Sequence, residues 1–118
     1  SYIFNSLAQV KEYLEIQTSL VVSSTIPIDH NLKAENKVIA LCRARRADTY
    51  VNPIGGAQLY SKDRFKSADI ELRFLKANDF EYPQFGSTFV PWLSIIDVMM
   101  FNSKDKIKAY LSSFYTLL

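Results

Sequence analysis

The sequence predicts an α/β fold: a three-stranded, mainly parallel sheet in a Rossmann-like βαβαβ arrangement, with helices on both faces. Of the 118 residues, 48% are hydrophobic, which is enough for one compact core, so we expect a single α/β domain over residues 1–118. Three short strand-like stretches alternate with two longer helix-like stretches. Strands joined by helical crossovers run parallel, and the crossovers are right-handed.

The first helix and the first strand are predicted near the N-terminus. Apolar residues recur at helical spacing from Asn5 to about Ile16, and Asn5 is a suitable N-cap. The stretch from Leu20 to Ser24 is rich in apolar and β-branched residues and does not alternate, which is typical of a strand covered on both faces.

Two further helices flank the second strand. One is predicted from about Lys33 to Arg46, after a loop in which Asp29 or Asn31 can cap it. Its buried residues should be Val38, Leu41 and Cys42. The second strand is predicted over Thr49–Val51, and the helix that follows it over Ala57 to about Lys66.

The third strand is predicted over Ile70–Leu75, where apolar and charged residues alternate, so we expect it at a sheet edge with one wet face. Residues Phe80–Pro91 have no period and form a loop rich in aromatic residues. Its last proline should open a helix that is apolar almost all round and therefore buried. Ser103 should cap a last helix over Lys104 to about Tyr115.

The charge balance excludes some classes of partner. The net charge of +2 is spread along the chain, so we expect no nucleic acid as partner. The one basic cluster, Arg43, Arg45 and Arg46, is explained by a solvated helix end. The apolar runs are shorter than the roughly 18 residues that span a bilayer, so we expect no membrane insertion.

Cys42 is the only cysteine and His30 the only histidine. A zinc site with several such ligands is excluded within the chain, and we predict no metal site, although carboxylates could still bind a hard cation. A lone cysteine favours a reducing compartment, so we predict a cytoplasmic protein. His30 has no neighbouring Ser or Cys and is more simply a surface residue than a catalyst. Whether the chain uses a cofactor stays open.

Asn52, Gly55 and Gly56 are the first candidate site. Backbone N–H groups at the start of a helix could receive a phosphate or carboxylate, with Asn52 orienting the ligand. Alternatively, the two glycines only make the turn from strand to helix, because neither a complete G-x-G-x-x-G nor a Walker lysine is present.

Glu81, Tyr82 and Gln84 in the aromatic loop are the second candidate site. Tyr82 or Phe85 could stack on a base or sugar ring while Glu81 and Gln84 bind hydroxyl groups. The alternative is that Tyr82 and Phe85 are a lid over the core, pinned by Pro83 and turned by Gly86.

Ser94 and Asp97 lie three residues apart on the apolar helix and so share a face. A buried carboxylate needs hydrogen-bonding partners, so Asp97 is either a satisfied core residue or a group that supports a ligand site in a crevice.

Four blocks of sequence carry a family resemblance: YVNPIGGAQLY, FKSADIELRFLKAN, EYPQF and FVPWLSIIDVMMFNS. With these blocks in this order, the chain resembles the WbqC-like family of bacterial proteins over roughly Leu32–Phe114, and more weakly before that. The resemblance implies a role in making O-antigen or other surface polysaccharides. The family's N-terminal half does not correspond to any part of this sequence, so the resemblance also implies that the chain is the C-terminal part of a larger protein. Half of a ligand crevice would then be missing, and the 20–24 strand would be an open edge available for a homodimer.

Three functions remain open from the sequence. The leading hypothesis is binding of a nucleotide, a nucleotide sugar or another phosphorylated ligand at the carboxyl ends of the strands, within surface-polysaccharide biosynthesis. The alternative is a non-catalytic interaction module that assembles biosynthetic enzymes, since few residues suit acid–base chemistry. In a third hypothesis, catalysis belongs to the rest of a larger protein and this part holds the substrate. Whether the chain is itself an enzyme stays open.

Overall fold

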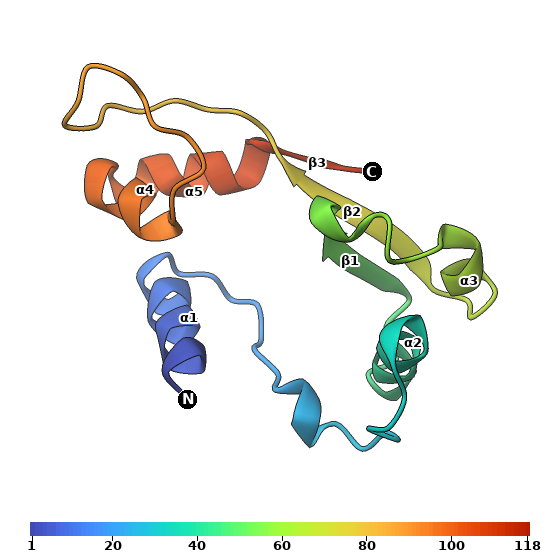
Figure 1. Ribbon diagram of the computed structural model, residues 1–118. Coiled ribbons are helices and arrows are strands. Elements are labelled where there is room, and N and C mark those ends of the chain that lie inside the picture. Colours follow the sequence, from blue (N-terminus) through green and yellow to red (C-terminus); the bar gives the residue numbers. More distant parts are fainter. The chain divides into compact units, whose positions relative to one another are not determined.

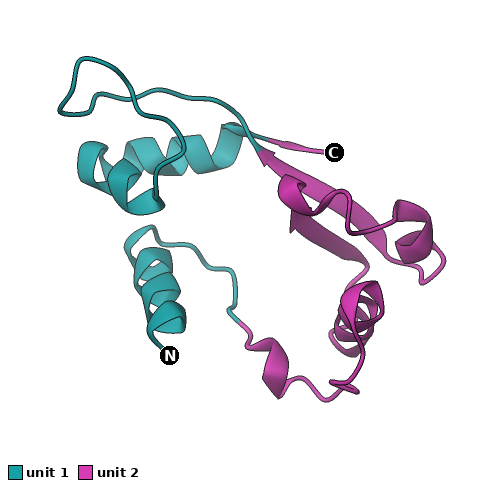
Figure 2. Cartoon of the chain, viewed as in Figure 1, with its two compact units in different colours: residues 1–20, 77–115 teal, residues 21–76, 116–118 magenta.

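The computed structural model describes residues 1–118 as five helices, two short 3-10 turns and three strands (Figure 1). In chain order these are α1 (Tyr2–Tyr13), a turn (Ser23–Thr25), α2 (Ala34–Ala44), β1 (Thr49–Pro53), a turn (Ile54–Gly56), α3 (Lys62–Lys66), β2 (Glu71–Ala77), α4 (Ile95–Phe101), α5 (Lys104–Ser113) and β3 (Tyr115–Leu117). The chain forms two compact units, coloured separately in Figure 2. Unit 1 contains residues 1–20 and 77–115, and unit 2 contains residues 21–76 and 116–118.

The sheet has the order β1-β2-β3 and is mixed. β1 and β2 are parallel, in a register that runs from Thr49 opposite Glu71 to Pro53 opposite Leu75. Phe74 of β2 and Leu118, which follows β3, exchange both backbone N–H···O bonds at 2.9 Å, the pattern of an antiparallel pair. The fold class is therefore α/β, as predicted. The prediction of a mainly parallel sheet is wrong, and the prediction of a Rossmann-like arrangement is not confirmed.

The predicted edge position of the third strand is also wrong, because β2 lies in the centre of the sheet. Its residues alternate because one face of the sheet is open to solvent. Leu72 and Phe74 point into the core, whereas Glu71 and Arg73 form an exposed ion pair at 2.7 Å.

The predicted strand from Leu20 to Ser24 does not exist. This segment is extended chain followed by the Ser23–Thr25 turn, and Leu20, Val21 and Val22 are all more than 40% exposed. Their β propensity does not produce a strand because no neighbouring strand pairs with them. The open sheet edge on which the homodimer prediction was based is therefore absent.

Unit 2 is built on one apolar core. Its buried residues are Ile39 and Cys42 from α2, Phe65 from α3, and Ile70, Leu72 and Phe74. Tyr50 of β1 stacks on Phe65, with ring centroids 5.6 Å apart and 9° between the planes. Burial raises the pKa of the Cys42 thiol. The α2 helix confirms the predicted helix, but Lys33 is its N-cap and no side chain caps it. Of the three residues predicted to be buried, only Cys42 is; Val38 and Leu41 are half-buried, and Ile39 is buried in their place.

The helix predicted from Ala57 begins five residues later, at Lys62. Ser61 is its N-cap and accepts a hydrogen bond from the Arg64 backbone N–H at 3.4 Å. The chain between the glycine pair and Ser61 forms turns, so the glycines do not lie at the start of a helix.

Unit 1 combines α1, the aromatic loop, α4 and α5. Its buried residues are Leu14, Tyr82, Val98 and Ile107. The α1 helix begins earlier than predicted, at Tyr2, with Ser1 instead of Asn5 as its N-cap. Ser103 caps α5 as predicted, accepting from the Lys106 backbone N–H at 3.3 Å.

The helix predicted to be opened by Pro91 and buried is shorter and more exposed. The α4 helix begins only at Ile95, and Val98 is its one buried residue. Ile96 and Met100 are 51% and 70% exposed. A helix that is apolar on all sides is buried only where other parts of the chain cover all of its sides. The seven-residue α4 helix is covered only on the side of Val98. No helix in the structure has both the length and the apolar character of a membrane-spanning segment.

Candidate functional site

Asn52 at the end of β1 is held by bonds within its own segment. Its Oδ1 accepts a hydrogen bond from the Tyr50 hydroxyl at 3.0 Å, and its Nδ2 donates to the Pro53 carbonyl at 2.9 Å. Both polar ends of the amide are thus engaged. The structure explains this side chain without a ligand.

The two glycines that follow differ in what surrounds them. A Cβ added to Gly56 would lie 2.1 Å from Asn52 Nδ2, whereas a Cβ added to Gly55 meets nothing within 4 Å. Neither glycine has a positive φ. Gly56 is therefore needed so that the Asn52 amide can lie against the backbone. A ligand-binding role of Asn52, Gly55 and Gly56 stays a prediction.

Tyr82, Gln84 and Asp97 are brought together by hydrogen bonds in unit 1. The Tyr82 hydroxyl donates to Asp97 Oδ2 at 2.6 Å, and Gln84 Nε2 donates to the same oxygen at 2.9 Å. The Gln84 amide also bridges the loop, donating to the Val90 carbonyl at 3.1 Å and accepting from the Val90 N–H at 2.9 Å. These bonds connect the first part of the aromatic loop to α4 and connect Val90, near the loop's other end, to Gln84.

The Tyr82 side chain is 7% exposed. Burial, together with its hydrogen bond to Asp97, raises the pKa of the Tyr82 phenol. Asp97 lies in the first turn of α4, where the helix dipole favours a carboxylate. Ser94 is the N-cap of that helix and accepts from the Ile96 N–H at 3.2 Å. The contacts of Ser94 and Asp97 are those of a cap and a satisfied carboxylate.

Glu81 is separate from this cluster of hydrogen bonds. Its carboxylate is exposed and has no hydrogen-bond or ion-pair partner in the structure. It lines a surface cavity of about 430 Å³ with Tyr82 and Gln84. His30 in unit 2 is also exposed; its Nε2 lies 2.9 Å from the Ile26 carbonyl, an arrangement that needs no catalytic role.

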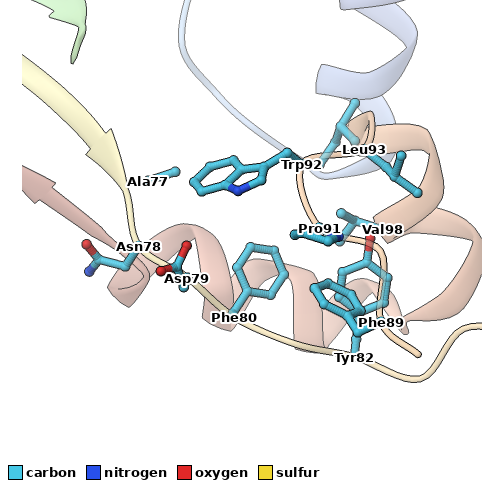
Figure 3. Close-up of a pocket in the computed structure, with 11 residues that line it drawn as sticks. Ala77, Asn78, Asp79, Phe80, Tyr82, Phe89, Pro91, Trp92, Leu93 and Val98 are labelled. Atoms are coloured by element: carbon cyan, nitrogen blue, oxygen red, sulfur yellow. The ribbon is translucent and has the colours of Figure 1, made fainter. Parts of the chain in front are cut away.

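A second cavity of unit 1 is mostly apolar and has a volume of about 220 Å³. Figure 3 shows the indole of Trp92 on one side and the ring of Phe80 across from it, with Asn78 and Asp79 at one end. The remaining lining residues are Ala77, Tyr82, Phe89, Pro91, Leu93, Ile95 and Val98. The cavity therefore combines two facing aromatic rings with one carboxylate and one amide.

Trp92 has two unusual properties for a residue at this place. Its backbone has φ of 61°, a left-handed conformation that is uncommon for bulky residues and costs on the order of 1–3 kcal/mol. Its side chain is 74% exposed. Four other non-glycine residues also have a positive φ: Glu15, Ala34, Arg46 and Asp69. The backbone conformation therefore does not by itself mark Trp92 as a site residue.

The sequence indicated the loop but not this cavity. The apolar run after Pro91 predicts a buried helix that includes Trp92, and no local pattern distinguishes Asn78 and Asp79 between a strand and a loop. The signal that could have found them is the placement of an Asn-Asp pair at one end of the aromatic loop and a Pro-Trp pair at the other.

The aromatic loop and the cavity lie within a stretch that matches a family of known sequences. No curated protein and no solved structure matches the chain. The sequence model of a family described as the WbqC-like protein family matches residues 1–109 of the 118 residues. The match includes the N-terminal part, where the resemblance of the sequence blocks is weaker. The chain therefore belongs to the WbqC-like protein family.

Proposed function

We propose that this WbqC-like chain binds the sugar ring of a nucleotide sugar, or of another phosphorylated sugar, during the synthesis of bacterial surface polysaccharide. The observation that carries the proposal is the apolar cavity of unit 1, with Trp92 and Phe80 facing each other and Asn78 and Asp79 at one end. The C–H face of a sugar ring packs on the electron-rich face of an aromatic ring. Its hydroxyl groups need polar partners of the kind that Asn78 and Asp79 supply.

The size of the cavity limits what it can hold. Pockets for drug-sized ligands measure roughly 300–1,000 Å³, and this cavity measures about 220 Å³. It is therefore suited to a single ring and not to a whole nucleotide sugar. In the proposal, the rest of the ligand lies outside the cavity.

The charge of the lining favours the sugar over the phosphate. Asp79 is its only charged side chain, and a carboxylate repels a phosphate while accepting hydrogen bonds from hydroxyl groups. Asp79 is exposed and forms no ion pair in the structure, so its carboxylate is available to a ligand.

Trp92 is the only tryptophan of the chain, so its fluorescence reports on this cavity alone. The probes are UDP-glucose, UDP-N-acetylglucosamine, free UDP and the two free sugars. Binding should shift the Trp92 emission to shorter wavelength, because an exposed indole becomes covered. We expect the shift with a nucleotide sugar, and with its free sugar at higher concentration.

Asp79→Asn should weaken this binding about tenfold or more, the equivalent of the 1.5–3 kcal/mol of a hydrogen bond to a charged group. Glu81→Gln is the matched control, because Glu81 is an exposed carboxylate of the same segment that does not line the cavity. Equal effects of the two substitutions, or no emission change with any nucleotide sugar, would count against the proposal.

An interaction module that assembles biosynthetic enzymes is the second candidate function. It is favoured by exposed apolar residues of unit 1: Phe85 is 95% exposed, Trp92 74% and Met100 70%. This function predicts a stable complex between the chain and an enzyme of surface-polysaccharide biosynthesis. The protein complex should survive Asp79→Asn and be lost with Met100→Glu. Under the sugar-binding function, sugar binding should instead be weakened by Asp79→Asn and survive Met100→Glu.

A further inference from the structure

We propose that unit 2 contains a separate site for a phosphoryl group, in which Arg43 and Arg64 are the binding residues. Both side chains line one surface cavity of about 620 Å³. The cavity is bounded by residues 27–32, by α2 and by α3. This site lies in a different unit from the apolar cavity and does not depend on the sugar-binding proposal.

Arg64 is held in place without losing its charge. Its Nη2 donates to Asn36 Oδ1 at 2.6 Å, which links α3 to the first turn of α2. A guanidinium has five N–H donors in a rigid fork, so this bond leaves others for a ligand. Neither Arg64 nor Arg43 forms an ion pair with a carboxylate of the chain.

The wall formed by α2 leaves room for a ligand. Asn36, Ala40, Arg43 and Ala44 follow one another at helical spacing and all line the cavity. The two alanines have short side chains and fill little of the cavity, which Ile39 of the same helix also lines.

One carboxylate, that of Asp29, also lines the cavity. Its Oδ1 accepts a hydrogen bond from the Asn31 backbone N–H at 2.9 Å, which holds the carboxylate in a local turn. Two guanidinium groups against one carboxylate leave a net positive charge. One guanidinium can donate two parallel hydrogen bonds to two oxygens of the same phosphate. A phosphoryl group is therefore the ligand class that fits this site.

The test is a calorimetric titration of the full 118-residue chain with inorganic pyrophosphate. The ionic strength is held constant within each titration and is raised with NaCl from one titration to the next. We expect binding that weakens with added NaCl, as for an exposed charged site. The double substitution Arg43→Gln with Arg64→Gln should raise the Kd about tenfold or more, because it removes both charge-assisted partners of the phosphoryl group. Arg43→Gln alone keeps the Arg64–Asn36 bond and should also raise the Kd.

Arg45→Gln with Arg46→Gln is the matched control, because these exposed arginines follow α2 and do not line the cavity. We expect the control to bind pyrophosphate as the native chain does. UDP separates the sources of the phosphoryl group: tighter binding than pyrophosphate indicates a nucleotide, and equal binding indicates the phosphate alone. Absence of pyrophosphate binding, or equal losses in the two double variants, would overturn the proposal. Pyrophosphate contains no ring, so either result leaves the Trp92 fluorescence test of sugar binding unaffected.

Discussion

Gln84 connects two segments with a single amide. Its Nε2 donates to the Val90 carbonyl and to Asp97 Oδ2, and its Oε1 accepts a hydrogen bond from the Val90 N–H. Asp97 in turn accepts from the buried Tyr82 hydroxyl. Tyr82 and Gln84 therefore hold the loop against α4, as the lid alternative expects, and their role in ligand binding stays a prediction. Glu81 takes no part in these bonds.

Tyr82→Phe tests this network at alkaline pH. The folded chain keeps the Tyr82 phenol protonated above its usual pKa of about 10, because burial and Asp97 raise that pKa. Unfolding then releases a proton, so the stability that this shift contributes is complete below about pH 10 and is lost as pH rises further. Urea unfolding between pH 8 and pH 11 should show a smaller decline for Tyr82→Phe than for the native chain. At pH 7 the variant should lose about 1.5–3 kcal/mol of its free energy of unfolding, as for a hydrogen bond to a charged group.

Tyr50 and Cys42 in unit 2 also have raised pKa values, chiefly through burial, so the variant should keep part of the alkaline decline. A decline identical to that of the native chain would show that the Tyr82 phenol does not contribute.

Gly56→Ala and Gly55→Ala form a matched pair for the first candidate site. A Cβ at residue 56 displaces the Asn52 amide and weakens its bonds to Tyr50 and Pro53, so we expect a loss of about 1 kcal/mol. At residue 55 the Cβ meets open space, so Ala should be neutral or stabilise by up to about 1 kcal/mol through the unfolded chain. Thermal unfolding distinguishes the two, and equal losses would contradict the role given to Asn52.

At the level of elements, the chain of residues 77–93 and the short α4 helix together form the apolar cavity. Their rigidity depends on the Ser94 cap as well as on Asp97, since α4 has only seven residues and a short helix gains little from propensity alone.

Ser94→Ala should therefore destabilise the chain by about 1 kcal/mol, the usual effect of losing an N-cap. Ser103→Ala at the start of α5 should have a similar effect, because its Oγ bonds in the same way. The measurement is urea unfolding of each variant. If Ser94 touched the ligand directly, its loss would reduce sugar binding with unchanged stability, which is the outcome that we do not expect.

Local patterns predicted α2, β1, β2 and the Ser103 cap, because each is specified by residues within the element itself. They failed where a partner decides the outcome. Residues 20–24 have strand composition but no neighbouring strand, and β2 has the alternation of an edge strand although β3 covers its second side. The pairing of Phe74 with Leu118 joins distant parts of the sequence, and no local period indicates it.

At the level of the whole molecule, each compact unit has its own core and its own proposed site. The prediction of one domain over residues 1–118 stays a prediction. For the sites, the sequence indicated Tyr82, Gln84 and Asp97 as polar groups in an apolar setting, and the structure joins them. The sequence did not indicate Trp92 as a site residue. Its exposure and its left-handed backbone conformation depend on how the loop packs and not on the spacing of residues in the sequence.

Saturation-transfer difference NMR on a nucleotide sugar tests the central claim most directly. Saturation passes from the protein to the ligand protons that touch it, and the claim places the sugar ring between Trp92 and Phe80. We expect the sugar-ring protons to receive more saturation than the base protons, and Asp79→Asn to reduce the transfer to both. Stronger transfer to the base, or no transfer to any part of the ligand, would contradict sugar binding in the cavity.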